Sequence, residues 1–174
     1  FKATAGAAGI VVTTDGFKRS ASDYQTPRGR QLNSFVDSEG YSAGASYLWS
    51  SGFVGASYSR ITSLYGIPGA EAEEARPRID LLQEKVQAKG EWRVRNAGIE
   101  AIRFWLGATD YRHNEVVVEH AHAEAAEGEA EDHSADRDIV GTRFKNRERE
   151  GRFEIQHLPI MTGLGELSGA VGLQ

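Results

Sequence analysis

Three segments of the chain alternate apolar and polar residues with a period of two, and this pattern constrains the fold more than any other feature. Successive side chains of a β-strand point to opposite faces, so the pattern indicates strands. The first segment places Tyr41, Ala43, Ala45, Tyr47 and Trp49 on one face. The second places Val86, Ala88, Gly90, Trp92 and Val94 opposite charged or amide side chains. The third places Ile102, Phe104, Leu106 and Ala108 opposite Arg103, Trp105 and Thr109. We therefore expect an all-β protein.

A helix competes with this interpretation only in the segment 70–92, which is rich in Glu, Ala, Leu, Gln and Lys. Pro77 and Gly90 oppose one long helix, and the alternation after Gln83 favours a strand. We therefore predict a loop up to about Leu81 and a strand from there.

The apolar faces of these strands are thin. A two-layer sandwich fills both inner faces with large Val, Ile, Leu and Phe side chains, whereas these faces mix Ala, Gly and Tyr with a few Trp residues. Aromatic residues lie towards the expected strand ends, at Tyr41, Trp49, Phe53 and Tyr65. This composition is typical of a lipid-facing barrel wall, in which each strand needs roughly 9 to 11 residues to cross.

The connections alternate in length. Short turns are expected at 50–52, 95–98 and, somewhat longer, 159–165. Polar excursions lie between them, at about 22–39, 67–78 and 112–142. Outer-membrane barrels join their strands by short periplasmic turns and long extracellular loops. The fold predicted is therefore an antiparallel transmembrane β-barrel segment of about seven strands.

The composition excludes several classes of protein. No run approaches 18 apolar residues, which excludes a transmembrane helix, and the absence of cysteine excludes disulfide frameworks and thiolate zinc sites. Basic residues are mixed with acids, so we expect no nucleic-acid partner. No nucleophile with a base, phosphate-binding loop or magnesium carboxylate set is recognisable, so we expect no enzyme. The chain opens at Phe1 without a signal-peptide pattern, and 165–174 looks like a strand without a partner, so we expect a truncated segment.

Several runs of residues resemble the barrel of TonB-dependent outer-membrane receptors. They are NSFVDS at 33–38, YGIPG at 65–69, GATDYRHNE at 107–115, GTRFKNRE at 141–148, EGR at 150–152 and LGEL at 164–167. The YGIPG element and a histidine-rich loop are most similar to the zinc-uptake branch of that family. The resemblance implies that residues 1–174 are a partial receptor barrel domain, with the plug and the remaining strands of a 22-stranded wall absent. It also implies location in the outer membrane of a Gram-negative bacterium, contact with outer-membrane lipid, and energy supplied by the TonB complex through the missing plug region.

The insert at 112–142 is acidic and rich in histidine. Imidazole is a good Zn²⁺ ligand, and carboxylates can complete its shell. The candidate metal ligands are His113, His120, His122, Asp132, His133 and Asp136. Their order matches no fixed motif, so one tight site and a loose collector of many weak ligands both stay open. A third interpretation is a solvated acidic loop whose histidines are incidental.

The function predicted is uptake of a metal ion, zinc, or of a metal chelate, with the insert as metal collector. No cofactor is expected, and Zn²⁺ enters only as the transported ligand. The alternatives are a receptor for a siderophore or haem, a passive porin-like barrel and, more distantly, a soluble β-domain. His157 shares the apolar face with Phe153 and Ile155. We therefore expect it at the periplasmic rim and not among the ligands.

Overall fold

The computed structural model describes residues 1–70, 72, 74–119 and 137–174. Eight strands form one antiparallel sheet in the order β1-β2-β5-β6-β7-β8-β9-β12. Their bounds are Lys2–Ala7, Ile10–Ala21, Val36–Trp49, Gly52–Gly66, Arg78–Asn96, Ile99–Glu119, Arg137–His157 and Ala170–Leu173. Two small hairpins complete the fold, β3 (Gln25–Thr26) with β4 (Gly29–Arg30) and β10 (Ile160–Thr162) with β11 (Gly165–Leu167). The prediction of an all-β antiparallel fold is confirmed.

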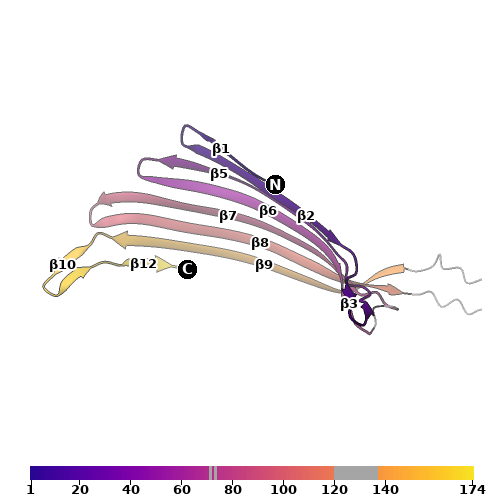
Figure 1. The fold of residues 1–174 in the computed structure, drawn as a ribbon. Coiled ribbons are helices and arrows are strands. Elements are labelled where there is room, and N and C mark those ends of the chain that lie inside the picture. The colour runs from indigo at the N-terminus through magenta and orange to yellow at the C-terminus, as the bar shows by residue number, and fades with distance from the viewer. Residues whose placement is uncertain (71, 73, 120–136) are drawn as a thin grey trace, which may run out of the picture.

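The sheet is a single curved layer, as Figure 1 shows. It is open within the described residues, because β1 and β12 lie at its two edges and do not pair with each other. The structure therefore contains no closed barrel. About seven strands were predicted, among them a strand without a partner at 165–174, and the sheet has eight. Residues 170–173 of that segment form β12, which does have a partner, because it pairs with β9. Among the described residues, no helix has the length and apolar character needed to cross a membrane.

Short and long connections lie at opposite ends of the sheet (Figure 1). Two-residue turns join β1 to β2 at Ala8 and Gly9 and join β7 to β8 at Ala97 and Gly98. All four residues have positive φ, between 51° and 82°, as a type I′ hairpin turn requires. Residues 50–51 join β5 to β6 at the same end. The longer connections, 22–35, 67–77 and the one between β8 and β9, lie at the other end, so the predicted alternation is confirmed.

Three loops are shorter in the structure than predicted. Strand β8 continues to Glu119 and β9 begins at Arg137, so both flanks of the insert predicted at 112–142 are strand. The connection predicted at about 22–39 ends before Val36 and contains the β3–β4 hairpin, and β7 begins at Arg78, three residues before Leu81. The ladder between strands is made by backbone groups, so pairing with a neighbour extends strands through stretches whose side chains look like loop.

The register places one kind of side chain on each face. Residues opposite each other in the ladder point to the same face. On one face, the half of the sheet nearer the short turns forms an apolar band. The band comprises Ile10, Val12, Tyr41, Ala43, Ala45, Tyr47, Trp49, Val54, Ala56, Tyr58, Val86, Ala88, Trp92, Ile102, Phe104, Leu106, Ala108, Phe153, Ile155, Val171 and Leu173. It runs across the sheet from β2 to β12.

The sheet has no hydrophobic core of its own. Among the described residues only Ala72, Ile79 and Ala101 are buried apolar side chains. Band residues are instead open to the surroundings, with Trp92 52 % and Leu106 53 % exposed. Such a sheet gains stability from its backbone ladder and from contacts between neighbouring strands, and its apolar face requires a covering that these residues do not provide.

Aromatic side chains mark the two margins of the band. Tyr47 and Trp49 stack near the short turns, with ring centroids 5.8 Å apart. Tyr41 and Tyr58 lie towards the opposite margin, with centroids 6.1 Å apart. The predicted placement of Tyr41 and Trp49 near strand ends therefore corresponds to two aromatic margins, whereas Phe53 and Tyr65 point to the other face, since their partners are Glu91 and Ile79.

Candidate functional site

The face opposite the apolar band is mainly polar along its central part. Its side chains, hereafter the polar face, are Thr13, Asp15, Ser42, Gly44, Ser46, Gly55, Ser57, Ser59, Lys85, Gln87, Lys89, Glu91, Arg103, Trp105, Thr109, Glu148, Glu150, Arg152 and Glu154. Hydroxyls, amides and both signs of charge are all present. The polar face therefore offers hydrogen-bonding groups and charges of both signs.

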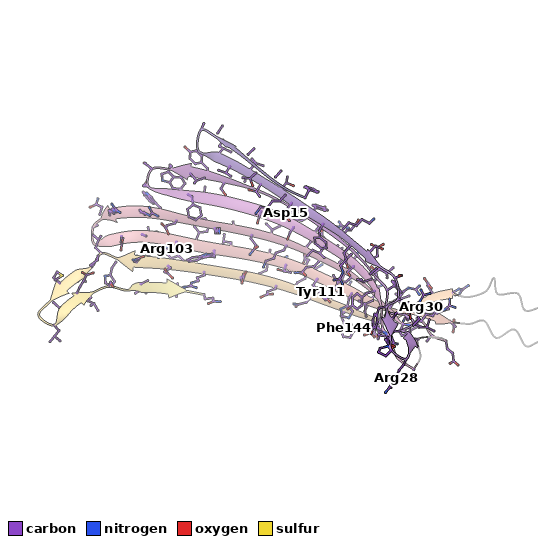
Figure 2. The ribbon with its side chains drawn as sticks, viewed as in Figure 1. Asp15, Arg28, Arg30, Arg103, Tyr111 and Phe144 are labelled. Carbon is purple, nitrogen blue, oxygen red and sulfur yellow. The ribbon has the colours of Figure 1, made fainter. Side chains whose placement is uncertain are left out.

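An alternating chain of charges crosses three strands of the polar face. Glu91 accepts hydrogen bonds from Arg93 Nε at 2.9 Å and from Arg103 Nε at 2.8 Å. Arg103 also donates from Nη1 to Glu154 at 3.0 Å, and Arg152 donates to the same carboxylate at 2.8 Å. Both carboxylates are largely covered, with side chains 17 % and 15 % exposed. Arg103, labelled in Figure 2, therefore joins two acids from neighbouring strands.

Of the polar row that the alternation predicts, Glu91, Arg93 and Arg103 form ion pairs, whereas Lys85 and Lys89 form none with a described residue. Sequence reasoning missed Arg152 and Glu154, which lie about 50 residues further along the chain. Only the β8–β9 register brings them next to Arg103. The Arg152 guanidinium also lies over the Trp105 ring, 4.9 Å from its centroid, so the indole is held against the network by a cation–π contact.

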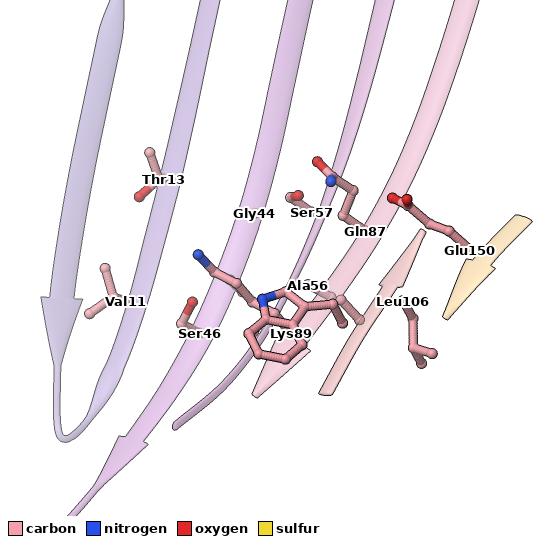
Figure 3. Close-up of a pocket in the computed structure, with 14 residues that line it drawn as sticks. Val11, Thr13, Gly44, Ser46, Ala56, Ser57, Gln87, Lys89, Leu106 and Glu150 are labelled. Atoms are coloured by element: carbon pink, nitrogen blue, oxygen red, sulfur yellow. The ribbon is translucent and has the colours of Figure 1, made fainter. Parts of the chain in front are cut away.

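Figure 3 shows a groove of about 360 Å³, which shares Trp105 with the surroundings of this network. Small residues leave room for it, because Gly44, Ser46, Gly55 and Ser57 face it from β5 and β6. Longer side chains surround it, namely those of Gln87, Lys89, Trp105 and Glu150. A methyl group on Gly55 would come within 2.4 Å of Ser46 Oγ, so the floor has no room for a larger residue there. The groove offers hydroxyl, amide, ammonium and carboxylate groups beside an aromatic ring.

A second cluster lies nearer the long connections, where Tyr111 and Phe144 are labelled in Figure 2. His113 is part of strand β8, opposite Leu81 and Phe144. Its Nδ1 lies 2.7 Å from the Tyr111 hydroxyl, and its ring centroid lies 4.5 Å from that of Phe144. His113 is thus held by aromatic neighbours on a regular strand, six residues before the strand ends at Glu119.

The other predicted metal ligands, His120, His122, Asp132, His133 and Asp136, lie outside the described residues. Among the described residues, no three histidine, aspartate or glutamate side chains, His113 included, lie close enough together to hold a metal ion. The metal assignment to these six residues stays a prediction. The insert that carries five of them does join β8 to β9, at the end of the sheet with the long connections.

His157 ends β9 at the end of the sheet with the short turns, and its location at a periplasmic rim stays a prediction. Its Nδ1 lies 2.8 Å from the Leu158 carbonyl oxygen.

No protein-family model matches the sequence. The site therefore stands on its geometry, which presents a polar face with a groove and a charge network, an apolar face without a covering, and a histidine-bearing insert at one end.

Proposed function

We propose that this chain forms part of the wall of an outer-membrane β-barrel of the TonB-dependent receptor type, which takes up a metal ion, zinc, or a metal chelate. One observation carries the proposal, namely the apolar band on a single-layer sheet whose opposite face is polar. Lipid would cover the band, and water or a polar plug would cover the other face.

The dimensions of the band support this placement. On β5 it extends from Tyr41 to Trp49, nine residues, which agrees with the roughly 9 to 11 residues that a tilted strand needs to cross a bilayer. Its aromatic margins match the girdles that such barrels carry at both membrane surfaces, where amphipathic rings are most stable. A soluble sheet of this kind would leave a large apolar patch in water, which favours association.

The polar face supplies the features that a receptor lumen needs. The network around Arg103 sets three cations against two acids, which leaves a net charge of only +1 (3 − 2), so it stiffens the wall without a strong field of one sign. The groove beside it presents unpaired lysine and amide groups, because no ion pair is formed by Lys89 within the described part of the chain. In the proposed receptor this groove faces the plug or a passing ligand.

The substrate part of the proposal rests on the insert. The family resemblance includes a histidine-rich extracellular loop, and the insert joins two strands at the end of the long connections. Its imidazoles and carboxylates would raise the local concentration of Zn²⁺ above the barrel mouth.

Zinc titration calorimetry on the full-length protein in detergent tests the substrate assignment. We expect the variant with His120, His122 and His133 all changed to alanine to bind zinc at least tenfold more weakly than the native protein. His157→Ala is the matched control, since that residue lies at the opposite end of the sheet, and its binding should equal the native value. Equal binding by the triple variant and the native protein, or binding by neither, would reject zinc capture.

A liposome assay separates the receptor from a passive barrel. Full-length protein in vesicles should admit no small polar solute, because a plug closes the lumen. Free entry of a sugar of a few hundred daltons would instead identify a porin-like barrel. Failure to insert into vesicles at all would reject the membrane assignment.

A further inference from the structure

A concentration of positive charge lies directly beyond the apolar band, on the same face of the sheet. Arg143, Lys145, Arg147 and Arg149 alternate along β9, and Arg112 faces Lys145 from β8. These five side chains, hereafter the basic patch, share the face of Leu106 and Phe153 because they fall in the same alternation. Arg149 precedes Phe153, the nearest band residue of β9, by four residues and lies opposite Ala108, so the patch begins where the band ends.

The acids nearby do not balance this charge. Asp110 on β8 faces the patch and forms ion pairs with Arg147 at 3.5 Å and Arg149 at 3.7 Å. Arg143 donates to the neutral Asn114 at 3.0 Å. Glu84 and Asp80 on β7 share this face in the same rows, so five cations stand against three acids and leave a local charge of +2 (5 − 3). Arg112 and Lys145 have no ion pair with any described residue.

Elsewhere on this face, cations are matched with acids on a neighbouring strand. Arg60 pairs with Glu84 at 3.4 Å, and Lys18 stands opposite Glu39 in the ladder. Arg112 and Lys145 are instead like charges placed directly opposite each other, which destabilises a sheet. On a face that only water covers, this repulsion remains. An anion bound between the two cations would replace the repulsion with attraction.

The patch is also hollowed. A groove of about 230 Å³ lies among Leu82, Glu84, Asp110, Arg112, Lys145 and Arg147. Its lining combines Leu82 with three cations and with two carboxylates, Glu84 and Asp110, which already pair with Arg60 and Arg147. Arg112 and Lys145 are therefore the cations left to bind a phosphate group, with an apolar wall beside them for an acyl chain. Arg147 is 83 % exposed, so its guanidinium can also approach a ligand from the membrane side.

We propose that the basic patch binds the phosphate headgroup of an anionic lipid in the leaflet that surrounds the long-connection end of the barrel. The inference rests on the proposed membrane wall, because only that orientation sets the patch at headgroup depth. Arg112, Lys145 and Arg147 hold the phosphate, and the acyl chains lie along the adjoining apolar band.

Lipid binding to the full-length, delipidated protein in a neutral detergent tests this, with native mass spectrometry as the readout. The probes are phosphatidic acid and phosphatidylcholine with the same acyl chains, and inorganic phosphate as competitor. We expect phosphatidic acid to bind at least tenfold more tightly. Each cation near an anionic headgroup contributes roughly a fivefold change in affinity, so Arg112→Gln/Lys145→Gln/Arg147→Gln should weaken phosphatidic acid by about a hundredfold.

The matched control is Arg19→Gln/Arg28→Gln/Arg95→Gln, which removes three exposed cations that make no side-chain contact among the described residues. This control variant should keep the native preference for phosphatidic acid over phosphatidylcholine. Equal affinity for both lipids, equal losses in both triple variants, or displacement of the lipid by equimolar phosphate would overturn the inference. Insertion into pure phosphatidylcholine vesicles tests the membrane wall separately: if insertion succeeds and the anionic preference is absent, only the lipid site fails.

Discussion

The two faces of β7 provide a direct test of what covers the apolar band. Ala88 lies within the band, between Ala56 and Leu106, whereas the adjacent Gln87 lies on the polar face. The substitutions Ala88→Arg and Gln87→Arg therefore add the same side chain at the same depth on opposite sides of one strand. Any difference between them reports the surroundings of the face and not the cost of arginine in a strand.

The magnitude follows from the position of Ala88. Trp92, at the band margin, is four residues away, about 13 Å along the strand and about 10 Å in height at a tilt of roughly 40°. Ala88 thus lies close to the middle of an apolar layer about 25 Å tall, where arginine facing lipid costs about 2 to 4 kcal/mol. If water covered the band, an exposed substitution would change the free energy of unfolding by about 0.5 kcal/mol or less.

The assay is urea unfolding of the full-length protein in phosphatidylcholine vesicles, followed by tryptophan fluorescence. The shift of the midpoint, multiplied by the slope of free energy against urea, gives the change for each variant. We expect Ala88→Arg to lose about 2 kcal/mol or more relative to Gln87→Arg. Two variants equal within about 0.5 kcal/mol would refute the reasoning that the band faces lipid.

Two further predictions concern the charge network and the glycines of the short turns. Arg103→Gln leaves the covered carboxylates of Glu91 and Glu154 without their shared cation, so it should lower the thermal midpoint more than Arg93→Gln, in differential scanning calorimetry at low salt; an equal or smaller loss would show that the two acids do not depend on Arg103. Gly98→Ala should lower the free energy of unfolding by about 1 kcal/mol, because φ is +80° and the space around the residue is open. Gly9→Ala at a similar φ should lower it more, because its methyl group would lie 2.5 Å from a neighbouring carbonyl oxygen. Equal melting temperatures for the two variants would contradict the packing argument.

The strand faces could be predicted from the sequence, because alternation over nine residues has one geometric meaning. The faces of 41–49 and of 102–108 therefore appear in the structure as predicted. The ends of the strands could not be predicted in the same way. Residues 112–119 are polar or β-branched and show no alternation of apolar and polar positions. They form a strand because β7 and β9 supply backbone partners on both sides.

The candidate site depends on register, which a single sequence does not reveal. The groove exists because Gly44 and Gly55 come close together on neighbouring strands, and the network exists because Glu154 pairs opposite Arg103. Each residue alone looks ordinary. The histidines of the insert could be recognised from the sequence because their chemistry is local, but their geometry requires contacts that spacing does not encode.

In the proposed receptor, the lengths of β8 and β9 set the height of the insert above the membrane. From Asp110 to Glu119, β8 continues for ten residues beyond the apolar band. At roughly 3.4 Å per residue and a tilt of about 40°, this stretch rises about 25 Å above the hydrocarbon layer. In the proposed orientation the histidine-bearing insert therefore starts well outside the lipid headgroups. Substitutions in it would leave the membrane-spanning wall undisturbed, while the paired strands beneath fix its height above the membrane.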